Sequence, residues 1–365
     1  MTTSTTPPPS TTIRLTDPSS LIAAIPALLG FVPTRSLVVF CLEGDAASRV
    51  GLVARIDLPD PHDFDHAADA LVVEQLSVLC ARRGTHAVMV VVVEDRDAGS
   101  ALTHRRLLAA LRDACEAVGT ELVDAHLVDR VAVGACWRGY DHPHPRSGVV
   151  ADPQSSVVSA AHVAQGRVIH GARTELEELL RREGPARVEH LVALVDAALE
   201  AALLARELSG ARAVREDLEG VLAAVARVAA GERLFDEEIA HLGAALTDPL
   251  VRDACFGLAV GEHAEDAQAL WLQLSRVLPD PQRAEAAVLV AYSCYVRGEG
   301  PLAGIALRVA LVSRPAHRMA SLLDSALAGG LSPTIVRELA DTALVIAGDL
   351  GVALLPFTPG PPAAG

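Results

Sequence analysis

The sequence contains no lysine and no asparagine, so all 31 of its basic side chains are arginine. Without lysine there is no P-loop lysine to reach a nucleotide phosphate and no Schiff-base lysine to hold pyridoxal phosphate. The lysine and asparagine of a protein-kinase site are absent as well. Both missing residues have codons that begin with AA, which indicates a very GC-rich genome. We therefore expect none of these chemistries and no bound cofactor.

Long hydrophobic runs are also missing, although hydrophobic residues make up 51% of the chain and the mean hydropathy is +0.32. The longest purely apolar run covers residues 87–93, whereas a membrane helix needs about 20 such residues. Residues 1–12, MTTSTTPPPSTT, have neither the basic nor the apolar region of a signal peptide. We expect a cytoplasmic protein with no membrane partner and with disordered tails at residues 1–12 and 351–365.

Basic patches and paired cysteines are the remaining absences. The formal net charge is −15, and no arginine cluster stands out from its acidic neighbours, so we expect no nucleic-acid partner. The six cysteines are scattered and none forms a CxxC pair. Most lie within apolar runs, where a free cysteine behaves as a small hydrophobe. This pattern is typical of reduced thiols in a cytoplasm.

Residues 13–150 have the pattern of an α/β domain with a mixed sheet. An N-cap at Asp17 and a stop at Gly30 bound a first helix. The following segments read as two strands in a hairpin, a helix, a buried strand, a helix and two further strands, at residues 36–44, 49–59, 64–83, 85–95, 102–118, 121–128 and 130–137. Because helices and strands alternate, we expect mixed strand directions in one sheet.

Residues 151–350 lack strand signals and show helical spacing throughout, which predicts an all-α second domain. Within it, Ala303 and Ala310 follow Gly298 at the spacing of two closely packed helices, and Pro315 closes the unit. Together with the small residue Ala291, this segment resembles a tetratricopeptide repeat. A weaker copy precedes it from Ala267 to Pro279. An ordinary alanine-rich helical hairpin is the alternative interpretation.

Four stretches together resemble an actinobacterial family catalogued as a domain of unknown function. They are IPALLGFVPTRSLVV at 25–39, ARIDLP at 54–59, LTDPLVRDA at 246–254 and the segment 291–315. The resemblance spans about residues 13–345, and its first motif is the most specific. It implies a GC-rich actinobacterial source, in agreement with the missing AA-starting codons. It brings no activity, cofactor or catalytic residue.

The loop CWRGYDHPHPRSG, residues 136–148, is the first candidate site. Cys136, His142 and His144 could supply three zinc ligands, with Asp141 as a possible fourth, and a zinc site usually has four. The His-Pro-His-Pro run also reads as a stiff extended connector. In the family that the chain resembles, closely spaced cysteines follow the position of Tyr140, and histidines stand there instead. If the family uses those cysteines to bind a metal or for redox chemistry, this chain either replaces the thiolates by imidazoles or has lost that role.

The second candidate is an acidic edge where predicted strands end. If the strands at 49–59, 85–95 and 121–128 run parallel, their carboxyl ends meet at the edge where open α/β sheets bind ligands. The acids gathered there are Asp57, Glu94, Asp95, Asp97 and Asp129. They favour a cation or a cationic ligand; a solvated acidic rim is the alternative. Arg55, within the second strand, we expect to face solvent or, alternatively, to pair with a nearby acid.

These patterns predict a non-catalytic protein-interaction or regulatory scaffold with a protein partner. The helical repeat character supports this, together with the lack of an assembled catalytic set. The alternative is a small-molecule- or metal-dependent enzyme or sensor that uses the acidic edge. No GxSxG elbow anchors a serine nucleophile. The sequence does not single out one cysteine of the six as a nucleophile.

Overall fold

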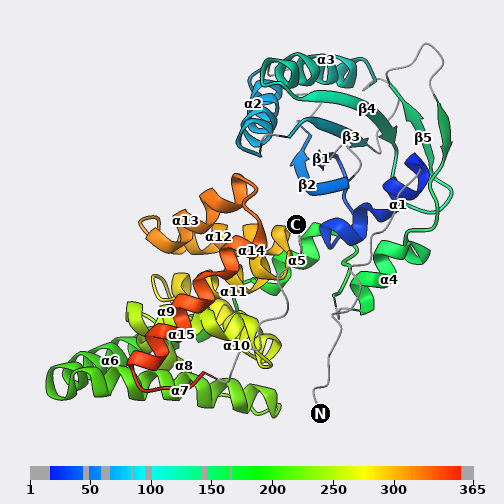
Figure 1. The fold of residues 1–365 in the computed structure, drawn as a ribbon. Helices are drawn as coiled ribbons and strands as arrows, with labels where there is room; N and C mark the ends of the chain where they lie inside the picture. The colour runs from blue at the N-terminus through cyan, green and yellow to red at the C-terminus, as the bar shows by residue number, and fades with distance from the viewer. Residues whose placement is uncertain are drawn as a thin grey trace, which may run out of the picture. The chain divides into compact units, whose positions relative to one another are not determined.

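A computed structural model describes residues 17–43, 49–58, 66–83, 85–94, 101–140, 146–164 and 167–354 (Figure 1). The chain divides into two compact units. One comprises residues 1–175 with 328–330, and the other comprises residues 176–327 with 331–365. The first contains a mixed sheet and the second is all-helical, so the predicted fold classes and their order are confirmed. In the described part of the chain, no helix is long and apolar enough to cross a membrane.

The first unit, here called the α/β unit, is built on a six-stranded sheet of order β2-β1-β3-β4-β5-β6. Its strands are β1 (Ser36–Glu43), β2 (Arg49–Asp57), β3 (Ala87–Val93), β4 (Glu121–Val128), β5 (Cys136–Gly139) and β6 (Ser147–Val149). The β3 and β4 strands pair parallel, and every other neighbouring pair is antiparallel. The expected hairpin of β1 and β2 is therefore confirmed.

Two helices, α2 (His66–Arg83) and α3 (Ala101–Ala117), cover one face of the sheet (Figure 1). Alternate residues of β1 and β3 point toward them, because successive strand side chains lie on opposite faces. The core between the helices and the sheet includes Leu37, Val39, Val90, Leu76 and Leu111, all at most 1% exposed.

The other face of the sheet carries α1 (Pro18–Leu29) (Figure 1). The Asp17 side chain accepts a hydrogen bond from the Ser20 backbone N–H, and Gly30 ends the helix in a left-handed conformation at φ 79°. Asp17 and Gly30 therefore bound the helix, as the sequence predicts. Buried residues of α1 pack against α4 (Val157–Ala164) as a small second core.

The last two strands differ from the prediction. A strand was expected over residues 130–137, but β5 begins only at Cys136 and a turn precedes it. Gly134 adopts φ 74°, and the Ala135 N–H donates to the Ala132 carbonyl. This hydrogen bond closes the turn. The apolar alternation of the segment reflects burial of Val131 and Ala135 in the turn, not strand pairing. The short β6 was not predicted.

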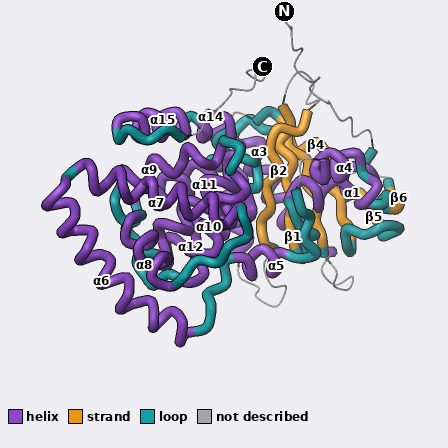
Figure 2. The backbone as a smooth tube through the Cα atoms, turned by 90° about the horizontal axis from the view of Figure 1, so that it is seen from below, coloured by secondary structure: helices purple, strands orange, loops and turns teal. Residues whose placement is uncertain are grey.

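The second unit, here called the helical unit, surrounds one central helix, α11 (Arg283–Val296) (Figure 2). Every residue of α11 from Ala284 to Val296 is buried. The α5 helix spans Arg173–Leu179, and the other helices are α6 (Pro185–Ser209), α7 (Ala211–Ala229), α8 (Asp236–Ala245), α9 (Pro249–Cys255), α10 (Ala264–Val277), α12 (Gly300–Ser313), α13 (Arg318–Ala328), α14 (Pro333–Arg337) and α15 (Leu339–Asp349).

The α11 and α12 helices form the expected hairpin. Its turn uses Gly298 at φ 75°, and the small residues Ala291, Ala303 and Ala310 are at most 1% exposed. Short side chains at these positions let the two backbones approach closely, which the spacing of alanines predicted.

Candidate functional site

The carboxyl ends of β2, β3 and β4 meet at one edge of the sheet. The β1 strand is antiparallel to both β2 and β3, so β2 and β3 run in the same direction, and β4 is parallel to β3. Ser36 at the start of β1 pairs with Asp57 on one side and with Val93 on the other. Val93 in turn pairs with Val128. We call this row the strand-end edge.

The strand-end edge brings together three of the five predicted acids, Asp57, Glu94 and Asp129. The Glu94 backbone N–H donates to the Val128 carbonyl at 3.0 Å. Glu94 is buried, with 4% of the residue exposed. The side chains of Asp57 and Asp129 are 74% and 50% exposed, and Asp129 pairs with Arg130 at 3.6 Å. Asp95 and Asp97 lie outside the described residues.

Arg55 is largely covered beside the strand-end edge, with 9% of its side chain exposed. Its Nε donates to the Ser36 hydroxyl at 2.7 Å, and its Nη2 forms an ion pair with Asp57. The guanidinium also lies over the Phe31 ring, 5.9 Å from the ring centroid. The expectation that Arg55 faces solvent is therefore wrong, and the alternative of an acidic partner is correct. Contacts from two other segments, not the strand pattern, cause the burial.

The backbone of Arg35 is unusual at this edge. It adopts φ 45°, which a residue with a Cβ rarely does. Its carbonyl accepts a hydrogen bond from the Leu58 N–H at 3.0 Å, just beyond the end of β2. The Ser36 hydroxyl donates to the Thr34 carbonyl at 2.7 Å. Because that proton is given to a carbonyl, Ser36 is not arranged as an activated nucleophile.

The Cys136–Gly148 loop is only partly described. Cys136 is an exposed free thiol at the start of β5, opposite Val149 of β6. His142 and His144 lie outside the described residues, as does Asp141. Among the residues that the structure describes, no group of three or more His, Cys, Asp or Glu side chains is arranged to hold a metal ion.

The β4 strand carries a buried polar cluster that no sequence motif marks. His126 is 1% exposed, and its Nε2 lies 3.3 Å from Oδ2 of Asp124. Burial alone would raise the pKa of Asp124, but the contact with His126, then the Ala125 backbone N–H and then Arg146, at 3.0 Å, outweigh burial and lower it. Trp137 meets His126 edge-on, with ring centroids 5.3 Å apart. The cluster therefore braces β4 against the two short strands.

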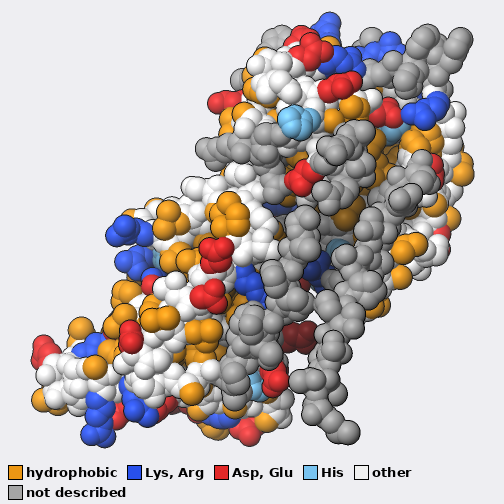
Figure 3. All heavy atoms as spheres, viewed as in Figure 1, with side chains coloured by type: hydrophobic (Ala, Val, Ile, Leu, Met, Phe, Trp, Pro, Cys, Tyr) orange, Lys and Arg blue, Asp and Glu red, His pale blue; other side chains and the backbone are white. Residues whose placement is uncertain are grey.

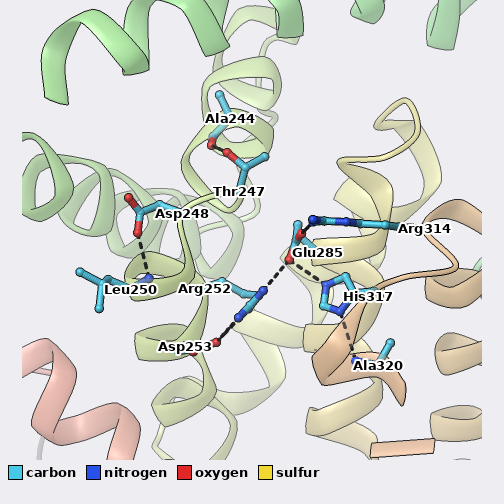
Figure 4. Close-up of polar contacts among 10 residues, drawn as sticks. All are labelled: Ala244, Thr247, Asp248, Leu250, Arg252, Asp253, Glu285, Arg314, His317 and Ala320. Atoms are coloured by element: carbon cyan, nitrogen blue, oxygen red, sulfur yellow. Dashed lines mark hydrogen bonds and ion pairs between the residues drawn. The ribbon is translucent and has the colours of Figure 1, made fainter. Parts of the chain in front are cut away.

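A second cluster lies inside the helical unit (Figure 4). Glu285 on α11 is 1% exposed and accepts hydrogen bonds from Arg252 on α9 at 3.1 Å and from Arg314 at 2.8 Å. Its Oε2 also lies 2.9 Å from Nε2 of His317. Arg252 has a further partner in Asp253. These contacts join α9, α11, the end of α12 and the start of α13 at one buried carboxylate.

The charge state of the Glu285 cluster follows from its partners. Burial raises the pKa of Glu285, but the hydrogen bond with His317 and the positive charge of Arg252 together outweigh it, so the net shift is downward. Burial lowers the pKa of Arg252, and the contact with Asp253 more than compensates. The carboxylate is thus ionised and satisfied on both oxygens, which is the condition for tolerating a buried charge.

The stretches on which the family resemblance rests supply residues to the strand-end edge and to the Glu285 cluster. Arg35, Ser36, Arg55 and Asp57 come from the first two stretches and form the strand-end edge. Arg252, from the third, holds Glu285. No curated protein and no solved structure matches the chain. The family model described as "Domain of unknown function (DUF4192)" matches residues 18–334, which is most of the sequence. The chain therefore belongs to this family of domains of unknown function.

Proposed function

We propose that the chain is a non-catalytic protein-interaction scaffold whose helical unit carries the docking surface. The observation that carries the proposal is the distribution of exposed apolar side chains. In the described part of the chain, every exposed leucine, isoleucine and phenylalanine belongs to the helical unit, whereas the α/β unit exposes only valines among its large apolar residues. Figure 3 shows hydrophobic side chains at the surface over these helices. Contiguous exposed apolar side chains mark interaction surfaces, and aromatic residues are enriched there.

The strongest local feature is the C-terminal half of α6, which runs along the outside of the helical unit (Figure 2). The buried residues of α6 end at Ala198. Beyond it, Leu203, Leu204 and Leu208 are 64%, 56% and 77% exposed. We call these three residues the α6 leucine surface.

The end of α6 is held firmly although its leucines are uncovered. Arg206 forms ion pairs with Asp217 of α7 and with Asp248 at the start of α9, both at 2.9 Å. An anchored helix end presents its side chains in one arrangement, which reduces the entropic cost of binding. The uncovered leucines are therefore better explained by a binding partner than by fraying of the helix.

The charge of the chain indicates the chemistry of that partner. The formal net charge is −15, and the exposed Glu200 and Glu207 flank the α6 leucine surface. We propose a partner protein that presents an apolar helix face bordered by basic side chains. The α11–α12 hairpin, which we interpret as tetratricopeptide-like, supports a scaffold of this kind. Six free cysteines and the absence of lysine and asparagine codons support a cytoplasmic, actinobacterial setting.

Affinity capture with the full chain tests the proposal. We expect a specific partner in lysate of the source organism, captured by the unaltered chain and lost with the double variant Leu204→Glu/Leu208→Glu. Leu322→Glu is the matched control, because Leu322 on α13 is similarly exposed at 63%. Binding should weaken as salt concentration rises. Equal capture by both variants, or no specific partner at all, would count against the α6 leucine surface.

The strand-end edge supports a second candidate function, binding of a small cationic ligand or a divalent cation. The register of β1, β2, β3 and β4 favours it, since Asp57, Glu94 and Asp129 lie at one edge of the sheet. Titration calorimetry with Mg²⁺, Ca²⁺ and a polyamine tests it, with Asp129→Asn as the variant. Heat of binding that is unchanged in the variant, or absent with all three probes, would exclude this role for the edge.

A further inference from the structure

The outer face of α6 carries an apolar stripe that is longer than the α6 leucine surface. Its members follow one another at steps of three or four residues, which places them on one side of the helix. They are Ala193, Ala197, Ala201, Leu204 and Leu208, and all are exposed. At a rise of about 1.5 Å per residue the stripe is about 22 Å long. We call it the α6 stripe, and it is long enough to pack along several turns of a second helix.

A row of acidic side chains borders the α6 stripe on one side only. Its members, all exposed, are Glu189, Asp196, Glu200 and Glu207. Steps of seven and four residues bring side chains close to one another along the same side of a helix. On the opposite side of the stripe lie Leu194 and Ala205, which carry no charge. We call the four carboxylates the acid row.

The acid row has no cation beside it. Within the residues that the structure describes, none of its four carboxylates has an ion-pair partner. The two arginines of α6 are used elsewhere: Arg187 pairs with Asp236 of α8, and Arg206 pairs with Asp217 of α7, both at 2.9 Å. Like charges that follow one another along a helix repel. A partner that carries basic side chains would relieve this repulsion as it binds.

We propose that the α6 stripe and the acid row together form the docking site of a single basic amphipathic helix, which lies lengthwise on α6 with its basic side chains on one flank only. This inference rests on the docking surface proposed above and adds its extent and the arrangement of charge on its partner. Because the stripe has alanine at three of its positions, the partner helix needs bulky apolar side chains opposite them. A second copy of α6 lacks these features, since its stripe is equally small and its row carries the same charge.

The stripe and the acid row should act on different steps of binding. Burial of Leu204 and Leu208 retains the bound helix, so it governs dissociation. The acid row lies at the rim of the contact, where charges chiefly set the association rate, its salt dependence and the choice of partner. Neutralising the row should therefore slow association and flatten the salt dependence, and it should change the dissociation rate much less.

Synthetic peptides and the full chain test this division. The probe is a helical peptide of about 18 residues with leucine at the heptad a and d positions and arginine along one flank. Two matched peptides carry glutamine or glutamate in place of every arginine. By fluorescence anisotropy we expect the arginine peptide to bind about tenfold more tightly than the glutamine peptide, and the glutamate peptide to bind more weakly still.

Two triple variants separate the acid row from the overall negative charge of the chain. Asp196→Asn/Glu200→Gln/Glu207→Gln should reduce the preference for the arginine peptide to less than about twofold. The matched control is Glu262→Gln/Glu265→Gln/Asp324→Asn, which removes the same charge from other exposed positions of the helical unit. The control should keep the full preference.

Three results would overturn the inference. The first is equal binding of the arginine and glutamine peptides, and the second is an equal loss of preference in the two triple variants. The third is a dimer of the unaltered chain, seen by sedimentation, that Leu204→Glu/Leu208→Glu dissociates, because a second copy would then occupy the stripe.

Failure of this inference differs from failure of the docking surface itself. If lysate capture depends on Leu204 and Leu208 but no peptide binds, the surface stands and its partner is not a basic helix. If the arginine peptide binds the unaltered chain and Leu204→Glu/Leu208→Glu equally, the peptide does not dock on the stripe, and this inference fails whatever the lysate contains.

Discussion

The Nε2 atom of His317 lies 2.9 Å from Oε2 of Glu285, and the backbone N–H of Ala320 donates to Nδ1 of the same ring at 3.2 Å. A ring nitrogen that accepts a hydrogen bond carries no proton, so Nδ1 is the bare nitrogen and Nε2 bears the hydrogen. One tautomer of His317 therefore caps the first turn of α13 and donates to a buried carboxylate. The two contacts fasten the start of α13 to the central helix α11.

Removal of the charge on Glu285 should destabilise the helical unit. Glu285→Gln leaves Arg252, whose side chain is 13% exposed, without the carboxylate that α11 provides. Breaking a buried pair costs about 3 kcal/mol, and Asp253 remains as a partner, so we expect a loss of about 2 kcal/mol in the free energy of unfolding in urea. Glu262→Gln, at an exposed position, should change it by less than about 0.5 kcal/mol. Equal losses in the two variants would contradict a structural role for the Glu285 cluster.

The same carboxylate should make stability depend on acid pH. The pKa of Glu285 is lowered in the folded state below its ordinary value of 4.5, because His317 and Arg252 outweigh the opposing effect of burial. A lowered folded-state pKa means that the unfolded chain binds the proton more tightly. The contribution of Glu285 is then complete above the unfolded pKa and is lost as pH falls through the folded pKa.

Unfolding in urea at several pH values measures this dependence. The stability difference between the unaltered chain and Glu285→Gln should be constant from about pH 6 to pH 8 and should shrink below about pH 4.5. A difference that stays constant down to the acid limit of folding would show that Glu285 is not ionised in the folded state.

Much of the architecture follows from local patterns. The unbroken apolar run of β3 predicts a strand covered on both faces, and the spacing of polar residues predicts α2 and α3 on one side of it. Because short connections force each helix to reverse direction between strands, the shared edge of β2, β3 and β4 could also be expected. These features depend on residues close together in the chain.

The polar clusters could not be predicted in the same way. Arg55 reads as a solvent-facing residue in its own strand, and only its contacts with Phe31 and Ser36 from other segments explain its burial. Glu285 lies 33 residues from Arg252 and 32 from His317 in the chain, so no local spacing marks the cluster. A sequence pattern reports burial well, but it does not identify which distant residue satisfies a buried charge.

Arg55 should not tolerate replacement by lysine. Arg55→Lys keeps the charge but cannot donate to the Ser36 hydroxyl and to Asp57 in the geometry of a planar guanidinium. We expect a loss of about 1–2 kcal/mol in the free energy of unfolding, from one buried hydrogen bond and the contact with Phe31. Asp57→Asn removes a partner that is 74% exposed, so it should cost less than about 1 kcal/mol. Thermal unfolding of both variants compares the two losses of stability. A larger loss for Asp57→Asn would show that the ion pair with Asp57 stabilises Arg55 more than its contacts with Ser36 and Phe31 do.

Gly148 should be required by the position of Trp137. A Cβ at Gly148 would lie 2.9 Å from Cζ2 and 3.0 Å from Nε1 of the indole, which is closer than packed atoms approach. The indole cannot easily move, because it donates to the Ser19 hydroxyl at 3.0 Å and packs against His126. Gly148→Ala should therefore displace the ring and cost about 1–3 kcal/mol of stability.

The two indole N–H signals of the chain report this displacement directly, because Trp137 and Trp271 are its 2 tryptophans. In Gly148→Ala one signal should shift, and Trp137→Phe identifies which signal it is. Gly261→Ala is the matched control, since Gly261 has φ −100° and no atom within 4 Å of the added Cβ. Both signals should stay in place in that variant. If Gly148→Ala also leaves both signals and the free energy of unfolding unchanged, then the indole does not pack against β6 through Gly148.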